Sequence, residues 1–126
     1  MLMTVPGIDV SKWQTTTPPL AGLGFLFARA SIGLTADSMY ATHTKNARAA
    51  GLVVGAYHYN WGAIDPVKQA DYFLAASMDA DLIALDMEGE DCFSTAQALT
   101  LIARVQTRRR TVGLYHSPSG LPAAGQ

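Results

Sequence analysis

The chain has 126 residues, of which 49% are hydrophobic and 15% are charged, and its formal net charge is −1. This length suits a single domain spanning residues 1–126, and the composition excludes an intrinsically disordered chain. Near-balanced charge gives no reason to expect binding to nucleic acid or to an anionic membrane surface. Cys92 is the only cysteine, so an intrachain disulfide and a thiolate zinc site are excluded. The sequence predicts neither a metal nor a cofactor.

The chain carries no recognisable targeting or membrane segment. Residues 1–6 lack the basic region followed by a long apolar run that marks a signal peptide. No apolar stretch reaches the ~18 residues that a membrane span requires. We therefore expect no membrane insertion, and we expect the chain to be made in a cytoplasm.

Strand and helix patterns alternate along the chain. In chain order they predict a strand at Val5–Val10, a strand at Phe25–Ile32, a helix at Met39–Ala50, a strand at Leu52–Tyr59, a helix from Asp65 that includes Met78, a strand at Leu82–Glu88, a helix from a cap at Ser94 to about Arg108, and a strand at Thr111–His116. Strands separated by helices of this length indicate βαβ units and a parallel sheet, which is the α/β class. The nearly continuous apolar runs FLFA, LVVGA and LIAL are typical of strands covered on both faces.

Two carboxylates stand together at the end of the fourth predicted strand, in ALDMEGED. Because side chains alternate along a strand, Asp86 and Glu88 should point the same way. Their repulsion and desolvation should raise the pKa of at least one of them, and a carboxyl that keeps its proton can act as a general acid. The competing interpretation is that Asp86 makes a turn and Glu88 is solvated.

A third acid and several aromatic residues occur at the same strand ends. Asp9 ends the first predicted strand, where it either joins a carboxylate cluster or caps the following segment. The aromatic residues are Trp13, Tyr57, Tyr59, Trp61 and Tyr115. Aromatic rings stack on the apolar faces of sugars, although each of them alone is equally well explained as core or rim filling. Together with the carboxylates they favour a sugar cleft. The histidines show no metal-ligand spacing, and His58 is interpreted as a packing or hydrogen-bonding residue.

At this point the sequence resembles a known family. The segments GIDVSKWQ, FLFARASIG, AGLVVGAYHYNW, QADYFL, ALDMEGE and VGLYHS occur in the order and spacing of the glycoside hydrolase family 25 lysozymes, across residues 7–118. The resemblance implies an enzyme that cleaves the β-1,4 bond between N-acetylmuramic acid and N-acetylglucosamine in bacterial peptidoglycan. It also implies a β/α barrel of the TIM type.

The resemblance further implies roles for particular residues. Glu88 matches the proton donor, Asp86 its strand partner, and Asp9 the first-strand acid of the site. Substrate-binding positions implied in the same way are Tyr57, Tyr59, Trp61, Tyr115 and Arg29. We therefore expect a wall-degrading enzyme that leaves the cytoplasm by release, as a phage lysin does, or by another export route.

The sequence departs from the family pattern in two ways. Ile32 stands where the family usually carries a glutamate. The family barrel has eight strands, whereas this sequence predicts about five, with intervening helices. We therefore expect an incomplete barrel that lacks its C-terminal strands. Its open sheet edges would promote self-association.

Three interpretations remain open from sequence. The first is a family 25 muramidase weakened by truncation, and the second is a remnant that binds peptidoglycan with little or no turnover. The third is an unrelated open-sheet α/β domain, such as a phosphate-binding fold. A glycine-rich phosphate loop would favour the third, and none is present.

Overall fold

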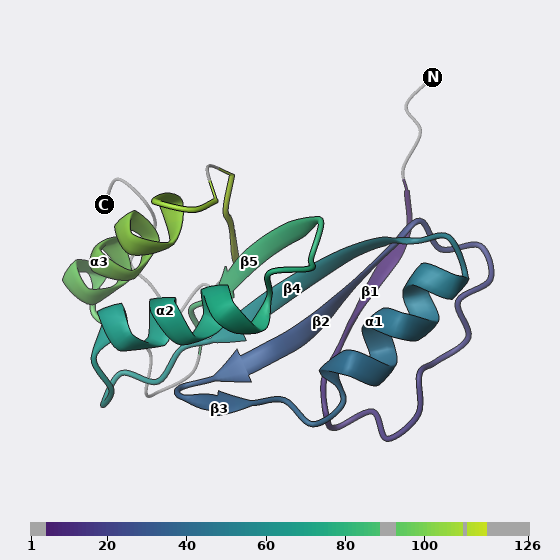
Figure 1. Ribbon diagram of the computed structural model, residues 1–126, viewed down its shortest axis with the longest axis horizontal. Coiled ribbons are helices and arrows are strands. Elements are labelled where there is room, and N and C mark those ends of the chain that lie inside the picture. Colours follow the sequence, from purple (N-terminus) through teal and green to yellow (C-terminus); the bar gives the residue numbers. More distant parts are fainter. Residues whose placement is uncertain (1–4, 89–92, 110, 116–126) are drawn as a thin grey trace.

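The computed structural model describes residues 5–88, 93–109 and 111–115, and its elements follow one another as alternating strands and helices (Figure 1). In chain order these elements are β1 (Gly7–Val10), β2 (Phe25–Ile32), β3 (Thr35–Ala36), α1 (Tyr40–Ala49), β4 (Val53–Tyr59), α2 (Pro66–Ala76), β5 (Leu82–Asp86), α3 (Thr95–Gln106) and β6 (Gly113–Tyr115). None of the helices in these ranges is long and apolar enough to span a membrane.

The strands form one sheet in the order β1-β2-β4-β5-β6, and each neighbouring pair along this order is parallel. This arrangement confirms the predicted α/β class with five parallel strands. The short strand β3 pairs antiparallel with the end of β2 and was not predicted. A two-residue strand carries too little periodicity to stand out in a sequence.

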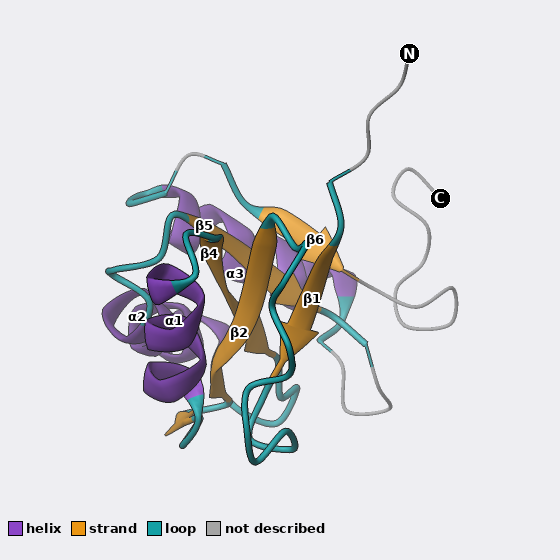
Figure 2. Ribbon diagram, turned by 90° about the vertical axis from the view of Figure 1, so that its right-hand side faces the viewer, coloured by secondary structure: helices purple, strands orange, loops and turns teal. Residues whose placement is uncertain are grey.

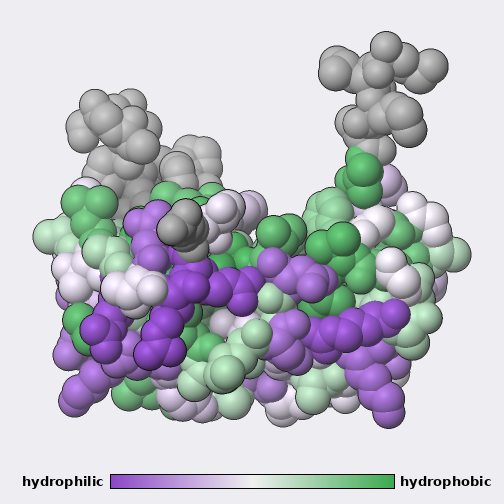
Figure 3. All heavy atoms as spheres, turned by 45° about the horizontal axis from the view of Figure 1, so that its top comes forward, coloured by the Kyte–Doolittle hydropathy of each residue, from purple (hydrophilic) through white to green (hydrophobic). Residues whose placement is uncertain are grey.

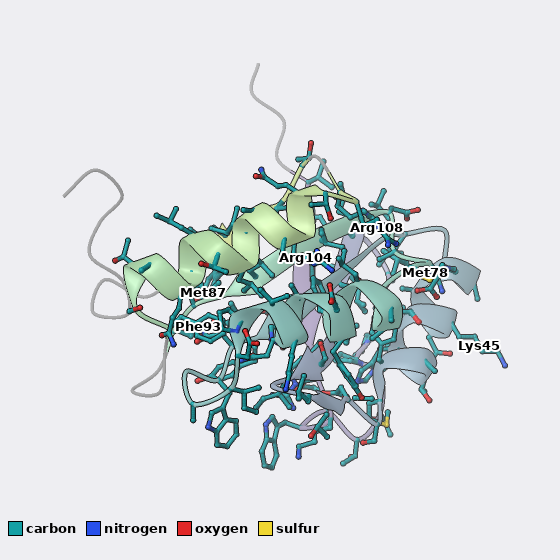
Figure 4. All side chains as sticks on the ribbon, turned by 60° about the vertical axis from the view of Figure 1, so that its left-hand side comes forward. Lys45, Met78, Met87, Phe93, Arg104 and Arg108 are labelled. Atoms are coloured by element: carbon teal, nitrogen blue, oxygen red, sulfur yellow. The ribbon has the colours of Figure 1, made fainter. Side chains whose placement is uncertain are left out.

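The helices surround the outer, convex side of the curled sheet (Figure 2). Two apolar clusters fill the space between helices and sheet. One joins Phe73, Leu85 and Leu101, and the other joins Leu26 and Val54. Met87 and Phe93, both fully or almost fully buried, lie beneath the amino-terminal end of α3 (Figure 4). The opposite, concave side of the sheet has no helix against it among the described residues.

The helix starts follow the sequence signals closely. The Asp65 carboxylate accepts a hydrogen bond of 2.9 Å from the Val67 N–H, one residue beyond Pro66 at the first helical turn. Ser94 and Gln97 form a reciprocal capping box at the start of α3. Four predicted strands are shorter than expected, since β1 begins at Gly7, β4 begins at Val53, β5 ends at Asp86 and β6 covers Gly113–Tyr115. His116, the predicted end of the last strand, lies outside the described residues.

The strands β1 and β6 are the open edges of the sheet as described. Large apolar side chains are exposed near these edges and at the amino ends of the strands. They include Val5 (64% exposed), Val53 (45%), Leu82 (44%), Leu114 (45%) and Tyr115 (58%). Hydrophobic residues gather along the upper part of the surface in Figure 3, above a band of hydrophilic ones. The described residues therefore form the predicted incomplete barrel, and some of their large apolar side chains are exposed.

Helix α3 offers a direct test of the packing between helices and sheet. Leu101 is fully buried, whereas Leu99 on the same helix is 61% exposed. Replacing Leu101 by Ala should lower the free energy of unfolding by about 2–5 kcal/mol, because it removes buried methyl groups and leaves a cavity. Replacing Leu99 by Ala should change it by less than about 0.5 kcal/mol. Chemical denaturation of both variants measures the contrast, and equal effects would contradict this placement of α3.

Candidate active site

The register of the sheet places on one face those predicted site residues that lie on strands. Paired residues of parallel strands point to the same side, and side chains alternate along each strand. Asp9 pairs with Phe27, and Tyr57 pairs with both Arg29 and Ala84. Two residues further along β5, Asp86 pairs with Tyr115 of β6. These side chains therefore belong to the concave side of the sheet, which we call the inner face.

A cavity of about 290 Å³ opens on this inner face. Its lining residues are Gly7, Ile8, Asp9, Phe25, Phe27, Tyr57, Ala84, Leu85, Asp86 and Tyr115. Two acids and two tyrosines thus share a hollow that is otherwise apolar. This composition suits a sugar, whose apolar ring faces need apolar or aromatic contacts and whose hydroxyl groups need a few polar ones.

Two phenylalanines of β2 line the cavity. The Phe25 and Phe27 rings lie 6.0 Å apart between centroids, at an interplanar angle of 85°. The Phe25 ring lies over Gly7 and the Phe27 ring over Gly55, so closely that a Cβ at either glycine would overlap the ring. The glycines thus let aromatic rings fill the inner face where neighbouring strands approach.

The acidic residues meet at the carboxyl ends of β1 and β5. The Asp86 carboxylate accepts a bond of 3.3 Å from the Glu88 N–H, and the two side chains share a hydrogen bond. Burial raises the pKa of Asp86 to about 7, with further contributions from the charges of Glu88 and Asp9. The sequence predicted a raised pKa for at least one member of the pair. The raised pKa that the structure shows belongs to Asp86.

The raised pKa of Asp86 predicts a pH dependence of stability. The fold favours the protonated carboxyl, so its contribution is complete below pH 3.8, the ordinary pKa, and is lost as pH rises through about 7. Replacing Asp86 by Asn should therefore raise the melting temperature at pH 8 by several degrees and leave it nearly unchanged at pH 4. Thermal melts of both proteins across this range measure the difference. If the Asp86→Asn variant melted at a lower temperature than the unaltered chain at pH 8, the idea that burial disfavours the charged Asp86 carboxylate would be contradicted.

A buried ion pair stands beside the acids, and sequence reasoning missed one of its members. The Arg29 Nε donates to the Asp37 carboxylate over 2.9 Å, and the two side chains are 8% and 0% exposed. Asp37 also accepts from the Lys12 and Met39 N–H groups, at 2.9 and 2.8 Å. Asp37 therefore joins β2, the loop after β1 and the start of α1. Arg29 pairs across strands with Tyr57 but does not line the cavity, so its predicted substrate contact stays a prediction.

A second buried network holds the loop after β4. His58 bonds to Ser31 through Nδ1 at 2.7 Å and to Gln69 through Nε2 at 2.8 Å. Burial lowers the pKa of His58 to about 4, so the ring is neutral at pH 7. This confirms the interpretation of His58 as a hydrogen-bonding residue. Asn60, which sequence reasoning missed, donates to the Asp86 carbonyl at 2.6 Å and accepts from the Phe93 N–H at 2.7 Å. It thereby fixes the backbone at Asp86.

The predicted aromatic residues take different positions around the cavity. Tyr57 and Tyr115 line it, and burial raises the pKa of Tyr57 to about 12. Tyr59 is half-buried and pairs with both Ile32 and Asp86, at the rim. Trp61 is 44% exposed on the loop that follows. Ile32 thus occupies a rim position on the inner face, where the family pattern led us to expect a glutamate.

No group of three His, Cys, Asp or Glu side chains in residues 5–88, 93–109 and 111–115 is arranged to hold an ion. Glu90 and Cys92 lie outside the described residues. Carboxylate, aromatic and other apolar side chains line the cavity.

A parallel sheet of β/α units with acids at the carboxyl ends of its strands defines the class of β/α-barrel proteins, here with an open sheet. Within that class, the sequence profile described as Glycosyl hydrolases family 25 matches residues 8–117. The chain belongs to this family.

Individual relatives agree with this assignment. The chain is 37% identical over 75 residues to Lysozyme M1 of Streptomyces globisporus, covering 55% of this chain and 26% of the relative. The fold matches the catalytic domain of endolysin ply40, from bacteriophage P40 of Listeria monocytogenes, with a TM-score of 0.79 and 27% identity, covering 90% of this chain and 64% of that one. It also matches the bacterial lysozyme of Streptomyces coelicolor with a TM-score of 0.75 and 30% identity, covering 90% and 63%. The chain thus spans less than two thirds of these relatives.

Proposed function

We propose that the chain is a peptidoglycan hydrolase that cleaves the β-1,4 bond between N-acetylmuramic acid and N-acetylglucosamine. The observation that carries this proposal is the hydrogen-bonded Asp86 and Glu88 pair at the end of β5, next to Asp9 and an apolar, tyrosine-lined cavity. Glycoside hydrolysis commonly needs two carboxyl groups beside the scissile bond, one of them able to hold a proton. Family membership and the lysozyme relatives support the same substrate.

We propose a role for each acid. Glu88 donates its proton to the glycosidic oxygen as the carbon–oxygen bond breaks, so that the leaving sugar departs as a neutral alcohol. Asp86 and Asp9 supply negative charge beside the positive charge that develops on the remaining sugar. Water then adds to the anomeric carbon of that sugar and gives up one proton to the carboxylates of the site, which restores the proton that Glu88 gave to the leaving group. Asp86 accepts a proton readily near pH 7, so the Asp86 and Glu88 pair can hold one proton between them over the pH range in which Asp86 titrates.

The binding of substrate follows from the aromatic residues. Tyr57 and Tyr115 present ring surfaces inside the cavity, while Tyr59 and Trp61 stand at the rim. Pyranose rings stack on such surfaces through their apolar faces. We further propose that the chain acts on the wall after release from the cytoplasm, or after export by another route.

The open sheet favours a second candidate function. Among the described residues β1 and β6 are the edges of the sheet, so the strands do not close around the cavity. Such a chain can bind peptidoglycan without completing the reaction. Clearing of a bacterial wall suspension by the unaltered chain, beside its Glu88→Gln variant, separates the two functions. Clearing by the unaltered chain alone supports the hydrolase, and binding without clearing supports the second candidate.

A further inference from the structure

A second hollow lies on the helix side of the molecule, between α2 and α3. It has a volume of about 580 Å³. Its lining includes Leu74 and Met78 from α2 and the turn after it, and Arg104, Arg108 and Arg109 from α3 and the turn after it. We call this hollow the arginine groove. It shares no lining residue with the cavity on the inner face.

The arginine groove lies at the opposite end of the sheet from the acids. In a βαβ unit the helix runs back against the strands, so each helix ends near the amino ends of the strands. The Arg109 Nη2 accordingly donates to the Ala80 carbonyl at 2.8 Å, two residues before β5 begins. Asp86 stands at the other end of β5. Figure 4 likewise shows Arg108 toward one end of the helix pair and Phe93 toward the other.

Positive charge is in excess in this groove. Its lining contains three arginines and a single acid, Asp71, whose two oxygens already bond to Arg104 at 2.8 and 3.2 Å. Asp79, on the neighbouring turn, is engaged by Arg48 at 3.2 Å and by the Tyr40 hydroxyl at 2.9 Å. Because the nearby acids are paired, the groove favours an anionic ligand.

The end of α3 does not need the Arg108 side chain for capping. The Arg104 carbonyl accepts from the N–H and the hydroxyl of Thr107, at 3.2 and 2.7 Å. The Val105 carbonyl accepts from the N–H groups of Arg108 and Arg109, at 3.1 and 3.0 Å. Within the described ranges, the exposed Arg108 side chain forms no hydrogen bond or ion pair with another side chain. Its guanidinium group therefore remains available to a ligand.

Apolar side chains lie beside these charges. Met78 is 80% exposed, and Leu74, about one turn earlier, is half-buried. Methionine adapts its shape to varied partners, and methionine and arginine are both enriched at protein interfaces. A ligand that fills the groove should therefore carry small apolar groups next to its negative charges.

We propose that the arginine groove binds the short acidic peptides that peptidoglycan carries on its glycan strands. These stem peptides present free carboxylates beside alanine methyl groups, whereas a phosphate polymer presents charge with few apolar groups. Arg108 binds a peptide carboxylate through two parallel hydrogen bonds, as Arg104 binds Asp71 within the protein. Leu74 and Met78 contact the methyl groups. This inference rests on the proposed function and adds a second contact with the wall, remote from the scissile bond.

Fluorescence anisotropy of a labelled, sugar-free stem peptide tests this inference on the 126-residue chain. The unaltered chain should bind the peptide, and Arg108→Gln should bind it roughly three- to tenfold more weakly, because one charge-assisted pair is lost. Arg108→Lys should recover only part of the affinity, since an ammonium group cannot form two parallel bonds to one carboxylate. Met78→Ala should weaken binding by about two- to fourfold, because it removes apolar contact area.

Lys45→Gln is the matched control for Arg108→Gln. Lys45 is an exposed cation on α1, outside the groove (Figure 4). Its replacement removes the same charge and should leave peptide binding unchanged. Glu88→Gln should also bind the peptide as the unaltered chain does, because Glu88 lies at the other end of the sheet. Arg108 and Lys45 are both exposed, so thermal melts of these variants should match that of the unaltered chain.

The outcomes separate the groove from the proposed hydrolase. Equal affinities of Arg108→Gln and the unaltered chain would overturn the inference, as would an equal loss in Lys45→Gln or in Glu88→Gln. Binding of poly(glycerol phosphate) that depends on Arg108, without binding of the peptide, would also overturn it. Wall hydrolysis without peptide binding would reject the groove and leave the hydrolase standing. Peptide binding that depends on Arg108, without hydrolysis, would support the groove and contradict the hydrolase.

Discussion

Replacing Glu88 by Gln should reduce the release of new reducing ends from peptidoglycan by about 100- to 10,000-fold, the range that a general acid contributes. Glutamine keeps the size and polarity of the side chain but has no proton to give to the glycosidic oxygen. Because Glu88 follows β5 and is only half-buried, the variant should fold normally. Reducing-end assays and thermal melts on the same samples measure both effects.

Asp71→Asn is the matched control for this substitution. Asp71 is also a carboxylate, but it lies in an exposed ion pair with Arg104 between α2 and α3, with Nε and Oδ1 2.8 Å apart (Figure 4). Its loss should leave turnover unchanged. Wild-type turnover in Glu88→Gln would reject Glu88 as the acid, and equal losses in both variants would point to a general loss of folding.

Adding strands that close the sheet into a barrel should have a large effect on solubility and on turnover. Joined after Tyr115 to the remaining C-terminal part of a family 25 relative, the chain should become monodisperse and gain roughly tenfold or more in turnover. The added strands would pair with β6 and β1 and cover exposed apolar residues such as Val53 and Leu82. Alone, the chain should self-associate through these edges.

Sedimentation velocity and wall-clearing rates measure this prediction. The control joins the same C-terminal part to the chain carrying Glu88→Gln, which should gain solubility without gaining turnover. If the unextended chain proved to be a monodisperse monomer with full lytic activity, a closed barrel would not be required for the reaction.

The fold could be predicted well because its signals are local. The apolar runs at Phe25–Ile32 and Leu82–Asp86 and the caps at Asp65 and Ser94 each depend on a few neighbouring residues. Strand β3 could not be predicted, because it exists only through its pairing with the end of β2. The exact ends of β5 and β6 likewise depend on partners in the sheet.

The candidate site could be predicted only in part. The acids Asp9, Asp86 and Glu88 are visible in sequence because parallel strands end at a common edge. Asp37 and Asn60 were missed because some of their bonds reach residues 25 or more positions away in sequence, as in the Lys12–Asp37 and Asn60–Asp86 bonds. Asp86 has a raised pKa because neighbouring strands bury its carboxyl group. The alternation of side chains along one strand does not show how deeply a carboxyl group is buried.

Mass spectrometry of the products from purified peptidoglycan tests the central claim most directly. Incubation with the chain should yield fragments that carry N-acetylmuramic acid at the new reducing end, and Glu88→Gln should yield none above background. Fragments with a reducing N-acetylglucosamine, peptide-bond cleavage, or equal product from the two proteins would contradict the proposed reaction and its assignment to the carboxylates at the end of β5.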